Sequence, residues 1–525
     1  MRLDKTIFRR LCSIARGKQR GQSRGEATLT PPADYASWLR ERISQRNALY
    51  PHRAEAGQFS LITCLYERSP ADAFREAADS VLQQTSSRFQ WVILAQGPIG
   101  LDLNVQLNRI SNDSRITLLR HSINSGIIPG MRQCVEKASG QYIVPLDGDD
   151  LLMPDTLSIV ASRLRDNKAA LLYSDEDHLV AGEPKYPVLR PDWDPILNLS
   201  CSYIFHLMAF DRRIGLDLGV FSDPAANWCQ DWDTVCRFVG GGYIPTHIPE
   251  VLYHWRTHKA SQTNKADPHE GSLQSQRHLL ERFLFTRSDG HLFDIKPFPI
   301  FRGAQEWWLA RRHIEPVSFD LAVTANQVPA RLPAHDGESY PFKSCAEASS
   351  VESLAAIVAN STSSLIAVIR GDLTAIDEEW PWEAQGLFAL HPDMSLLAGR
   401  ILDPSGNVLG GPEQIDAEGK SSCPYRGIAW QTPGEMAFAL KPHTVNSPNS
   451  AFFIARTEFL RTALSKFPRE ATLEFIGPWL AMLAHRQGHR VGYSPLIAAD
   501  AMAGFDCVMN PSDRERLAYL AFQNK

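Results

Sequence analysis

The sequence predicts an α/β protein with two tandem domains, each a mostly parallel sheet flanked by helices. Three observations support this fold class. Short apolar runs alternate with amphipathic helical segments across residues 58–290, and a second series of such runs begins near residue 315. The chain has 525 residues, of which 44% are hydrophobic and 22% charged. This composition is ordinary for a globular protein of two to four domains.

The first domain is expected to cover residues 58–290 and to begin with a buried strand at 59–65. Helical periodicity follows at 70–82 and again at 130–139, where apolar residues fall on one side. Further apolar, β-branched runs predict strands, and they lie at 91–95, 116–119, 142–146 and 171–173. Ligands of such sheets bind at the carboxyl ends of the strands.

The segment before this domain, residues 1–57, combines a basic beginning with a helical connector predicted at 35–49. Eight Lys and Arg residues lie between positions 1 and 24, with apolar residues at helical spacing in the first half. A basic amphipathic helix of this kind can lie on an anionic membrane surface. A solvated tail accounts for the same pattern equally well, so both interpretations stay open.

Composition excludes several classes of protein. A net charge of -5 argues against a nucleic-acid binder. The nine cysteines form no Cys-x-x-Cys pair and no regular framework, which favours reduced thiols in a cytoplasmic protein over disulfides or a zinc site. No apolar run is long enough for a transmembrane helix, and no signal-peptide pattern is present. We expect a cytoplasmic protein, with peripheral contact at the inner face of the membrane if residues 1–24 bind lipid.

The stretch 141–154, QYIVPLDGDDLLMP, carries the strongest chemical signal. A buried strand is expected to end where Asp147, Asp149 and Asp150 begin, and Gly148 lets the backbone turn tightly. Carboxylates this close repel one another unless a hard cation or backbone N–H groups neutralise them, and oxygen ligands favour Mg²⁺ or Mn²⁺. The same residues would also suit a turn and a helix start.

Four further motifs follow in order. Strand 171–174 ends in Asp175-Glu176-Asp177, a Pro-bounded loop reads RPDW at 190–193, QDWD stands at 230–233, and VLYHWR stands at 251–256. Together with LDGDD, this series resembles family 2 glycosyltransferases of the GT-A fold, in the subgroup that builds bacterial O-antigen, capsule and other surface glycans. The resemblance implies an inverting, metal-dependent hexosyltransferase that uses a nucleotide-diphosphate sugar.

The resemblance also implies roles for individual residues. Asp147 and Asp149 match the family's Asp-x-Asp, which holds the metal, and His254 matches a histidine near the diphosphate or metal. Asp231 matches the catalytic base, which takes the proton of the acceptor hydroxyl. The donor would be bound by Arg132, Asp150 and Arg256. The sugar or acceptor side would be lined by Glu176, Asp177, Trp193 and Trp232.

One departure from the family pattern concerns the nucleotide. Family members usually end the second strand with Asp-Asp-Gly-Ser or Asp-Asn-Gly-Ser, whereas this chain has Leu94-Ala95-Gln96-Gly97. Recognition of the base and ribose is therefore expected to be altered or weakened.

The second half, residues 315–525 after a linker at 291–314, resembles a degenerate copy of the first. Gly371-Asp372 can be laid on Gly148-Asp149, which places Arg370 where Asp147 would be. The segment 473–479, LEFIGPW, stands where the base would be and has neither aspartate. A cation would not sit beside Arg370, so this copy is expected to keep the fold without the chemistry.

The leading hypothesis is a glycosyltransferase that elongates a glycan or a lipid-linked glycan in surface-polysaccharide synthesis, with no nucleic-acid partner. One rival is a sugar nucleotidyltransferase, which would need a Gly-rich basic loop after the first strand, where this chain has YERSP at 66–70. The other rival is a catalytically silent glycan-binding or scaffold protein. Retention of the first-half carboxylates favours the enzyme.

Overall fold

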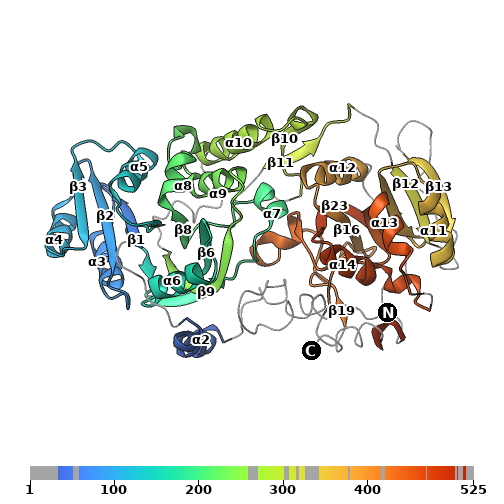
Figure 1. The fold of residues 1–525 in the computed structure, drawn as a ribbon, viewed down its shortest axis with the longest axis horizontal. Helices are drawn as coiled ribbons and strands as arrows, with labels where there is room; N and C mark the ends of the chain where they lie inside the picture. The colour runs from blue at the N-terminus through green and yellow to red at the C-terminus, as the bar shows by residue number, and fades with distance from the viewer. Residues whose placement is uncertain are drawn as a thin grey trace.

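The computed structural model shows two sheet domains side by side, joined by a long helix and a hairpin (Figure 1). It describes residues 34–50, 58–257, 270–300, 307–314, 319–324, 342–375, 379–415, 420–468, 470–502, 505 and 512–515. The basic segment 1–24 and its predicted membrane contact lie outside the described residues. Among the described helices, none is both long and apolar enough to cross a membrane.

The first sheet has nine strands in the order β3-β2-β1-β4-β8-β6-β9-β5, with β7 beside β6. Its strands are β1 (Phe59–Leu65), β2 (Phe89–Gln96), β3 (Ile116–His121), β4 (Tyr142–Pro145), β5 (Leu151–Leu152), β6 (Leu171–Val180), β7 (Glu183–Val188), β8 (Met208–Asp211) and β9 (Thr246–Arg256). Its helices are α3 (Ala71–Leu82), α4 (Leu101–Ile110), α5 (Ile127–Lys137), α6 (Thr156–Asp166), α7 (Pro195–Ser200), α8 (Arg212–Asp217) and α9 (Gln230–Gly240).

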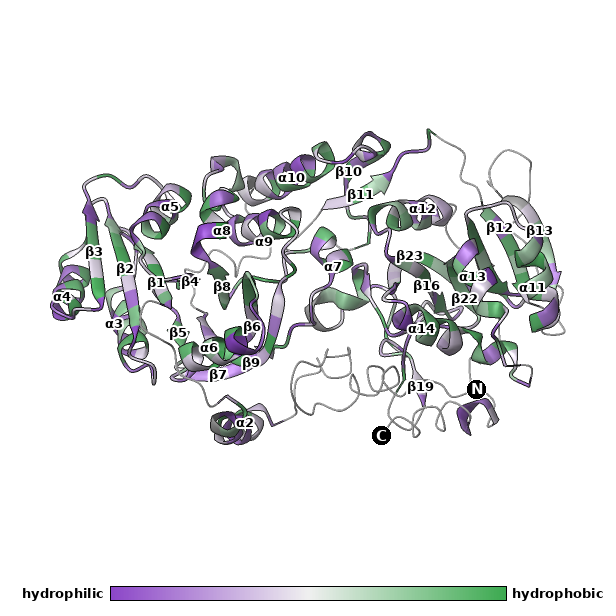
Figure 2. Ribbon diagram, viewed as in Figure 1, coloured by the Kyte–Doolittle hydropathy of each residue, from purple (hydrophilic) through white to green (hydrophobic). Residues whose placement is uncertain are grey.

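Helices cover both faces of this sheet because its strands carry apolar residues on both sides. One hydrophobic cluster joins the sheet to α3, α4 and α6, and includes Phe74, Leu107 and Leu157. The other joins it to α5 and α9 and includes Met131 and Val235. Figure 2 shows hydrophobic residues along the strands of both sheets and mixed colours on the covering helices.

The second sheet also has nine strands, in the order β13-β12-β14-β22-β16-β23-β15, with β17 beside β16 and β20 beside β23. The strands are β12 (Phe319–Thr324), β13 (Phe342–Ala348), β14 (Leu365–Arg370), β15 (Leu373–Ala375), β16 (Met394–Leu402), β17 (Val408–Gly410), β20 (His443–Thr444), β22 (Phe452–Arg456) and β23 (Arg490–Ala501). The helices are α11 (Val351–Asn360), α12 (Trp380–Leu390), α13 (Thr457–Leu464) and α14 (Ile476–Arg486). A small sheet beside it contains β18 (Pro412–Ile415), β19 (Ser421–Ser422) and β21 (Ser447–Pro448).

The two sheets share one topology. Strands β12, β14, β22, β16, β23 and β15 follow one another with the same relative directions as β1, β4, β8, β6, β9 and β5. In chain order α14 takes the place of α9, since each lies before the long strand that pairs with the sheet's last strand. The second half is therefore a structural repeat of the first.

The predicted fold class, α/β with two tandem sheet domains, is confirmed, but the pairing within each sheet is mixed. In the first sheet β3, β2, β1 and β4 are parallel, whereas β8 runs antiparallel to both β4 and β6. The chain passes from β6 to β8 through the antiparallel strand β7 and the six-residue helix α7, and not through a single crossover helix of the kind that joins parallel strands.

Two segments expected to be connectors have defined structure. The helix α2 (Tyr35–Leu49) packs on the first sheet, and its Arg46 donates to the buried carboxylate of Glu250. The segment 291–314, expected to be a linker, contains the hairpin of β10 (Phe293–Pro297) and β11 (Trp307–Arg311), which follows α10 (Glu270–Phe285). Helix α12 of the second domain contacts β11.

Candidate active site

The acidic loop 146–150 leaves the carboxyl end of β4 beside the end of β1. Leu146 continues the sheet, because its N–H donates to the carbonyl of Ile62 at 3.0 Å. Gly148 then passes so close to Leu65 that a Cβ atom at position 148 would lie 2.4 Å from Leu65 Cδ2. A larger residue at position 148 would therefore have to displace the Leu65 side chain, and glycine avoids this cost at the turn between the aspartates.

Asp150 is the buried member of this loop and is held by strand β9. Its carboxylate accepts hydrogen bonds from the Tyr253 hydroxyl and from the Arg256 N–H, both at 2.7 Å. The Arg256 guanidinium donates to the Asp149 carbonyl at 2.6 Å and to Glu76 on α3 at 2.7 Å. Burial raises the pKa of Asp150 to about 8, and the charges of Asp147 and Asp149 add to this effect.

His206 lies between Asp147 and Glu176. Its Nε2 is 3.7 Å from the Asp147 carboxylate, its Nδ1 is 3.2 Å from that of Glu176, and its ring stacks on Tyr253 with 4.7 Å between centroids. Burial alone would lower the pKa of His206, but hydrogen bonds to Asp147 and Glu176 outweigh burial and hold it well above the usual value. Glu176 is itself fixed by a fully buried ion pair with Arg190 at 2.9 Å.

Asp147, Asp150 and His206 form a candidate cation site. Each offers one ligand atom, and these atoms lie within 4.8 Å of one another. Two carboxylate oxygens and one imidazole nitrogen suit Mg²⁺ or Mn²⁺, and the side chain of Asp147 is 53% exposed, which leaves the site open to a ligand. The residues therefore fit the divalent cation that the sequence predicts, with a different set of ligands.

Asp149 and His254, the other two predicted metal ligands, lie outside this group. The cause for His254 is the alternation of side chains along a strand. On β9, Tyr253 faces the acidic loop, so its neighbour His254 faces the other way and its Nδ1 contacts Asp177 at 2.5 Å. The same alternation on β6 turns Glu176 toward His206 and Asp177 away from it.

Asp177, predicted to line the sugar or acceptor side, is consequently a buried structural residue. Besides His254, its carboxylate accepts a hydrogen bond from the Tyr35 hydroxyl of α2 at 2.5 Å. This pair of contacts attaches α2 to the back of the sheet. Glu176, predicted for the same role, lies on the side of the sheet that carries the cluster and contacts His206.

Asp231 lies in the first turn of α9 and faces the cluster. Burial raises its pKa from 3.8 to about 6, and the charges that act on it most strongly are those of His206 and Asp147, with a contribution from Glu176. A carboxyl group with a pKa near 6 is ionised at neutral pH and is basic enough to accept a proton. The predicted base therefore lies beside the candidate cation site.

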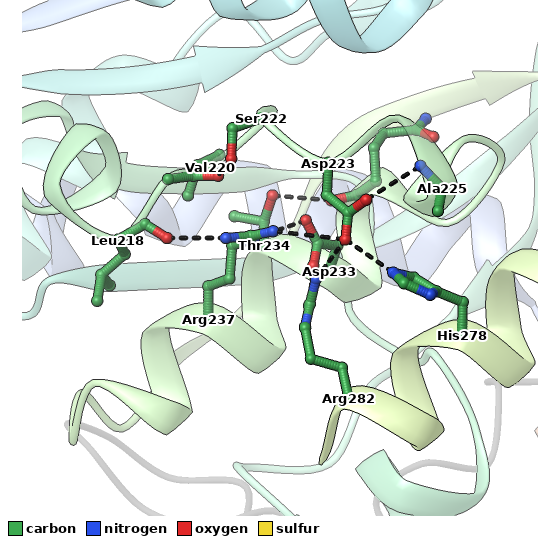
Figure 3. A network of polar contacts seen from close by, with 12 residues as sticks. Leu218, Val220, Ser222, Asp223, Ala225, Asp233, Thr234, Arg237, His278 and Arg282 are labelled. Atoms are coloured by element: carbon green, nitrogen blue, oxygen red, sulfur yellow. Dashed lines mark hydrogen bonds and ion pairs between the residues drawn. The ribbon is translucent and has the colours of Figure 1, made fainter. Parts of the chain in front are cut away.

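A polar network holds α9 in place (Figure 3). Asp233, two residues after Asp231 on α9, pairs with Arg237 at 2.7 Å and with Arg282 of α10. Arg282 and His278 both donate to Asp223 at 2.8 Å. Because Asp233 is committed to this network, the two aspartates of QDWD have different tasks: Asp233 fixes the helix and Asp231 faces the cluster.

Three other predicted residues have structural partners. Trp232 is buried in the core, and its Nε1 donates to the Asn198 carbonyl at 2.9 Å, so it does not line a sugar site. Arg132 pairs with Glu136 on its own helix and donates to the Val220 carbonyl at 3.2 Å. Trp193 is half-buried and stacks on Tyr203, with 6.4 Å between ring centroids.

The unusual end of the second strand also has a structural explanation. Gln96 is buried, and its Oε1 accepts hydrogen bonds from the N–H and the hydroxyl of Ser125 at 3.2 and 2.9 Å. Its Nε2 donates to the Gly126 carbonyl at 3.3 Å. The amide thus fastens the loop before α5, where the family pattern has an acidic group for the nucleotide.

Sequence reasoning missed His206, Tyr253 and Arg190 as parts of the site. His206 stands alone between Phe205 and Leu207, and a single histidine in an apolar context is usually structural. Tyr253 was missed because alternation separates it from His254 but does not say which of the two faces the loop.

Part of the first domain is similar to known glycosyl transferases. Residues 60–194 match the family model described as "Glycosyl transferase family 2". The chain is 27% identical over 286 residues to "Uncharacterized protein y4gI" of Sinorhizobium fredii, which covers 53% of this chain and 31% of that protein. It is 32% identical over 108 residues to "Putative colanic acid biosynthesis glycosyl transferase WcaA" of Escherichia coli, which covers 20% of this chain and 38% of that protein.

A third relative is "Amylovoran biosynthesis glycosyltransferase AmsE" of Erwinia amylovora, 18% identical over 200 residues, with 37% of this chain and 74% of that protein covered. The chain thus spans well under two thirds of the length of the first two relatives. Residues 60–194 of the first domain thus match the family that the sequence motifs resemble, and three of the five motifs lie within that range.

Proposed function

We propose that the protein is an inverting glycosyltransferase that moves a sugar from a nucleotide-diphosphate donor to a hydroxyl of a growing cell-surface glycan or lipid-linked glycan. The observation that supports this most directly is that Asp147, Asp150, His206 and Asp231 lie near one another, beside the carboxyl ends of β1 and β4. The family match of residues 60–194 and the polysaccharide-biosynthesis names of two relatives support the same reaction class.

Asp147, Asp150 and His206 would hold a divalent cation, which offsets the charge that develops on the leaving diphosphate. Tyr253 and Arg256 fix the Asp150 carboxylate through two 2.7 Å hydrogen bonds, so that its orientation is set before a ligand binds. Glu176 and Arg190 orient the His206 ring in the same way.

Asp231 takes the proton from the acceptor hydroxyl as that oxygen attacks the anomeric carbon and the bond from this carbon to the diphosphate breaks. Its pKa of about 6 suits this task at neutral pH. The network through Asp233 and Arg282 holds α9, so the Asp231 carboxylate keeps its position relative to the acidic loop.

The test is donor binding and transfer by the full chain across UDP-, GDP- and dTDP-sugars, with Mn²⁺, with Mg²⁺ and with chelator. We expect cation-dependent binding of one donor. Asp147→Ala and His206→Ala should each weaken that binding at least tenfold, while Asp231→Asn should bind the donor and lose transfer by about 10²-fold or more. The cation site would be refuted if donor affinity were the same with cation and with chelator.

His254 provides the matched control, because it is the other histidine proposed for this role and its ring contacts Asp177 on the opposite face. His254→Gln should keep cation-dependent donor binding within about threefold. If His254→Gln abolishes it and His206→Gln does not, the ligand set is wrong.

A catalytically silent glycan-binding protein is the second candidate, and one observation favours it. Gln96 replaces the acidic end of the second strand and is occupied by Ser125 and Gly126. This candidate predicts that no nucleotide sugar binds to the folded protein, with or without cation, while a glycan does.

A further inference from the structure

The second domain has a pocket at the place that corresponds to the candidate active site of the first. Thr324 and Arg370 are register partners at the ends of β12 and β14, the counterparts of β1 and β4, and both line a cavity of about 240 Å³. The residues just before β22 and at the start of α14 close it, and α14 is the counterpart of the helix that bears Asp231. A cavity therefore persists at this end of the repeated sheet.

The loop that carries the aspartates is shortened in this repeat. The first domain runs from residue 142 to residue 151 between the starts of β4 and β5, and the second runs from 365 to 373 between the starts of β14 and β15, which is one residue shorter. The registers at the two ends of this segment differ by one residue. Counted from Tyr142 and Leu365, which pair with the first residues of β1 and β12, Asp372 falls on Asp149, and counted back from Leu151 and Leu373 it falls on Asp150. The first of these counts is the overlay that the sequence predicts.

Asp372 pairs with an arginine, whereas Asp150 lies beside Asp147 and His206 in the candidate cation site. Its carboxylate forms a paired contact with Arg370, with Nε and Nη2 at 2.7 and 2.9 Å, and the guanidinium stacks on Phe505 at 4.0 Å. A cation at this position would face the Arg370 guanidinium. The pocket is thus built without a cation site at the loop.

The lining has reversed in charge relative to the first site. Carboxylates dominate around Asp147, whereas the second pocket has four basic and two acidic side chains: Arg370, Lys420, Arg426, Arg514, Glu413 and Glu474. Burial raises the pKa of Glu413 to about 7, which leaves that carboxyl largely neutral below pH 7. Because Arg370 is paired with Asp372, the surplus positive charge comes from Lys420, Arg426 and Arg514 against Glu474. A cavity with this charge and with the Ser422 hydroxyl in its lining suits an oxyanion.

We infer that this pocket binds an oxyanion carried on a sugar, a phosphate or a carboxylate, without a divalent cation. The carrier is assigned as a sugar on the basis of the proposed function, in which a glycan is the acceptor, and the anionic group is inferred from the charge of the pocket. The second domain would then hold a charged sugar of the acceptor while the first domain performs the transfer. Oxyanion binding by the pocket itself does not depend on the transfer reaction.

The test measures binding to the full chain by calorimetry in the presence of chelator, with glucose 1-phosphate, glucuronate, glucose and sulfate as probes. We expect binding of at least one charged sugar and at least tenfold weaker binding of glucose. Glucose 1-phosphate and glucuronate separate the phosphate from the carboxylate. Equal binding of glucose, or no binding of any anion, would overturn the inference.

Charge variants locate the binding. Arg426 and Arg514 are exposed, so substitutions there should leave the fold intact. Arg426→Ala should weaken anion binding by at least threefold, and the double variant that also carries Arg514→Ala should weaken it by at least tenfold. Lys466→Ala removes an exposed charge at the end of α13, outside the pocket, and should change binding by less than twofold. Equal loss in Lys466→Ala, or none in the double variant, would mean diffuse surface binding and refute the pocket.

Asp147→Ala separates this inference from the proposed function. Anion binding should persist in this variant within about twofold, because Asp147 lies in the first domain. If wild-type protein binds the anion and shows no transfer with any donor, the proposed function fails and the pocket stands. If transfer occurs and no anion binds, the pocket fails alone. Loss of anion binding in Asp147→Ala would place the anion in the first site and overturn the inference.

Discussion

Asp194 accepts two hydrogen bonds from Thr444 across the boundary between the two domains. The Thr444 N–H lies 2.6 Å from Oδ2, and its hydroxyl lies 2.8 Å from Oδ1. The same carboxylate caps α7 by accepting from the Ile196 and Leu197 N–H groups, and Ile196 packs in the core of the second domain. Asp194 thus joins a helix of one domain to a strand of the other.

Asp194→Ala should destabilise the contact between the domains. Loss of the cap costs about 1 kcal/mol, and loss of the two bonds from Thr444 to a charged acceptor brings the total to about 3 kcal/mol. Thermal unfolding should show a lower midpoint, and limited proteolysis should release the two domains as separate fragments.

Asp211 is the control for this variant, since its carboxylate caps α8 through the Ile214 N–H at 3.0 Å inside the first domain. Asp211→Ala should cost about 1 kcal/mol and release no separate domains. Equal effects of the two substitutions would show that the Thr444 contact contributes nothing.

Arg46 of α2 should be essential for stability. Its side chain is 1% exposed and pairs with Glu250 and Asp155, both at 3.2 Å. Arg46→Leu leaves Arg42, at 2.6 Å, as the remaining cationic partner of the buried Glu250 carboxylate and removes one partner from Asp155, so we expect a loss of about 2 kcal/mol in urea unfolding. Arg40→Leu, on the exposed side of the same helix, should stay within about 0.5 kcal/mol of the parent. A small loss for Arg46→Leu would mean that α2 is dispensable for the first domain.

Transfer should lose its rate on the acidic side of neutrality. Asp231 must be ionised to accept a proton, and its pKa of about 6 means that the ionised fraction falls as the pH drops through 6. We expect kcat/KM to fall about tenfold per pH unit below 6. An unperturbed aspartate would give the same fall near pH 4. A profile that is flat between pH 5 and 7 would exclude Asp231 as the base.

Oxyanion binding in the second domain should weaken as the pH rises above 7. Glu413 accepts hydrogen bonds from Asn449 and Ser421 and lies in the field of Arg426, and ionisation at a pKa of about 7 adds negative charge to the cavity. The other charged groups of the lining are Arg370, Lys420, Arg514 and Glu474.

Sulfate is the probe for this effect because its charge is constant between pH 6 and 8. Its affinity should fall roughly fivefold across this range, by Coulomb repulsion at short distance. Glu413→Gln should remove most of the dependence. An unchanged pH profile in this variant would show that another group is responsible.

Patterns of alternating strands and helices were enough to predict the fold class and many elements. The strand predicted at 59–65 and the helix predicted at 35–49 coincide with β1 and α2. Both could be predicted because an apolar run and a helical stretch are patterns within a few neighbouring residues. The partners of α2 could not be predicted, since Arg46 and Glu250 are 204 residues apart. The antiparallel insertion of β8 was missed for the same reason.

The candidate site was predicted in part. Asp147, Asp150, Glu176 and Asp231 do converge, because the carboxyl ends of strands and the start of α9 meet at one edge. Sequence motifs could not show which side of a strand each residue faces. That uncertainty put His254 and Asp177 in the site, and His206 became visible only when the strands were placed.

The shortened loop between β14 and β15 bears on how this repeat can change over evolutionary time. A copy disabled by substitutions can be restored by reverting them one at a time. Here the segment from the start of β14 to the start of β15 is one residue shorter than that from β4 to β5, so a restoring event would have to insert a residue as well as acidic side chains. Substitutions alone would therefore not restore the spacing of the acidic loop in the second domain.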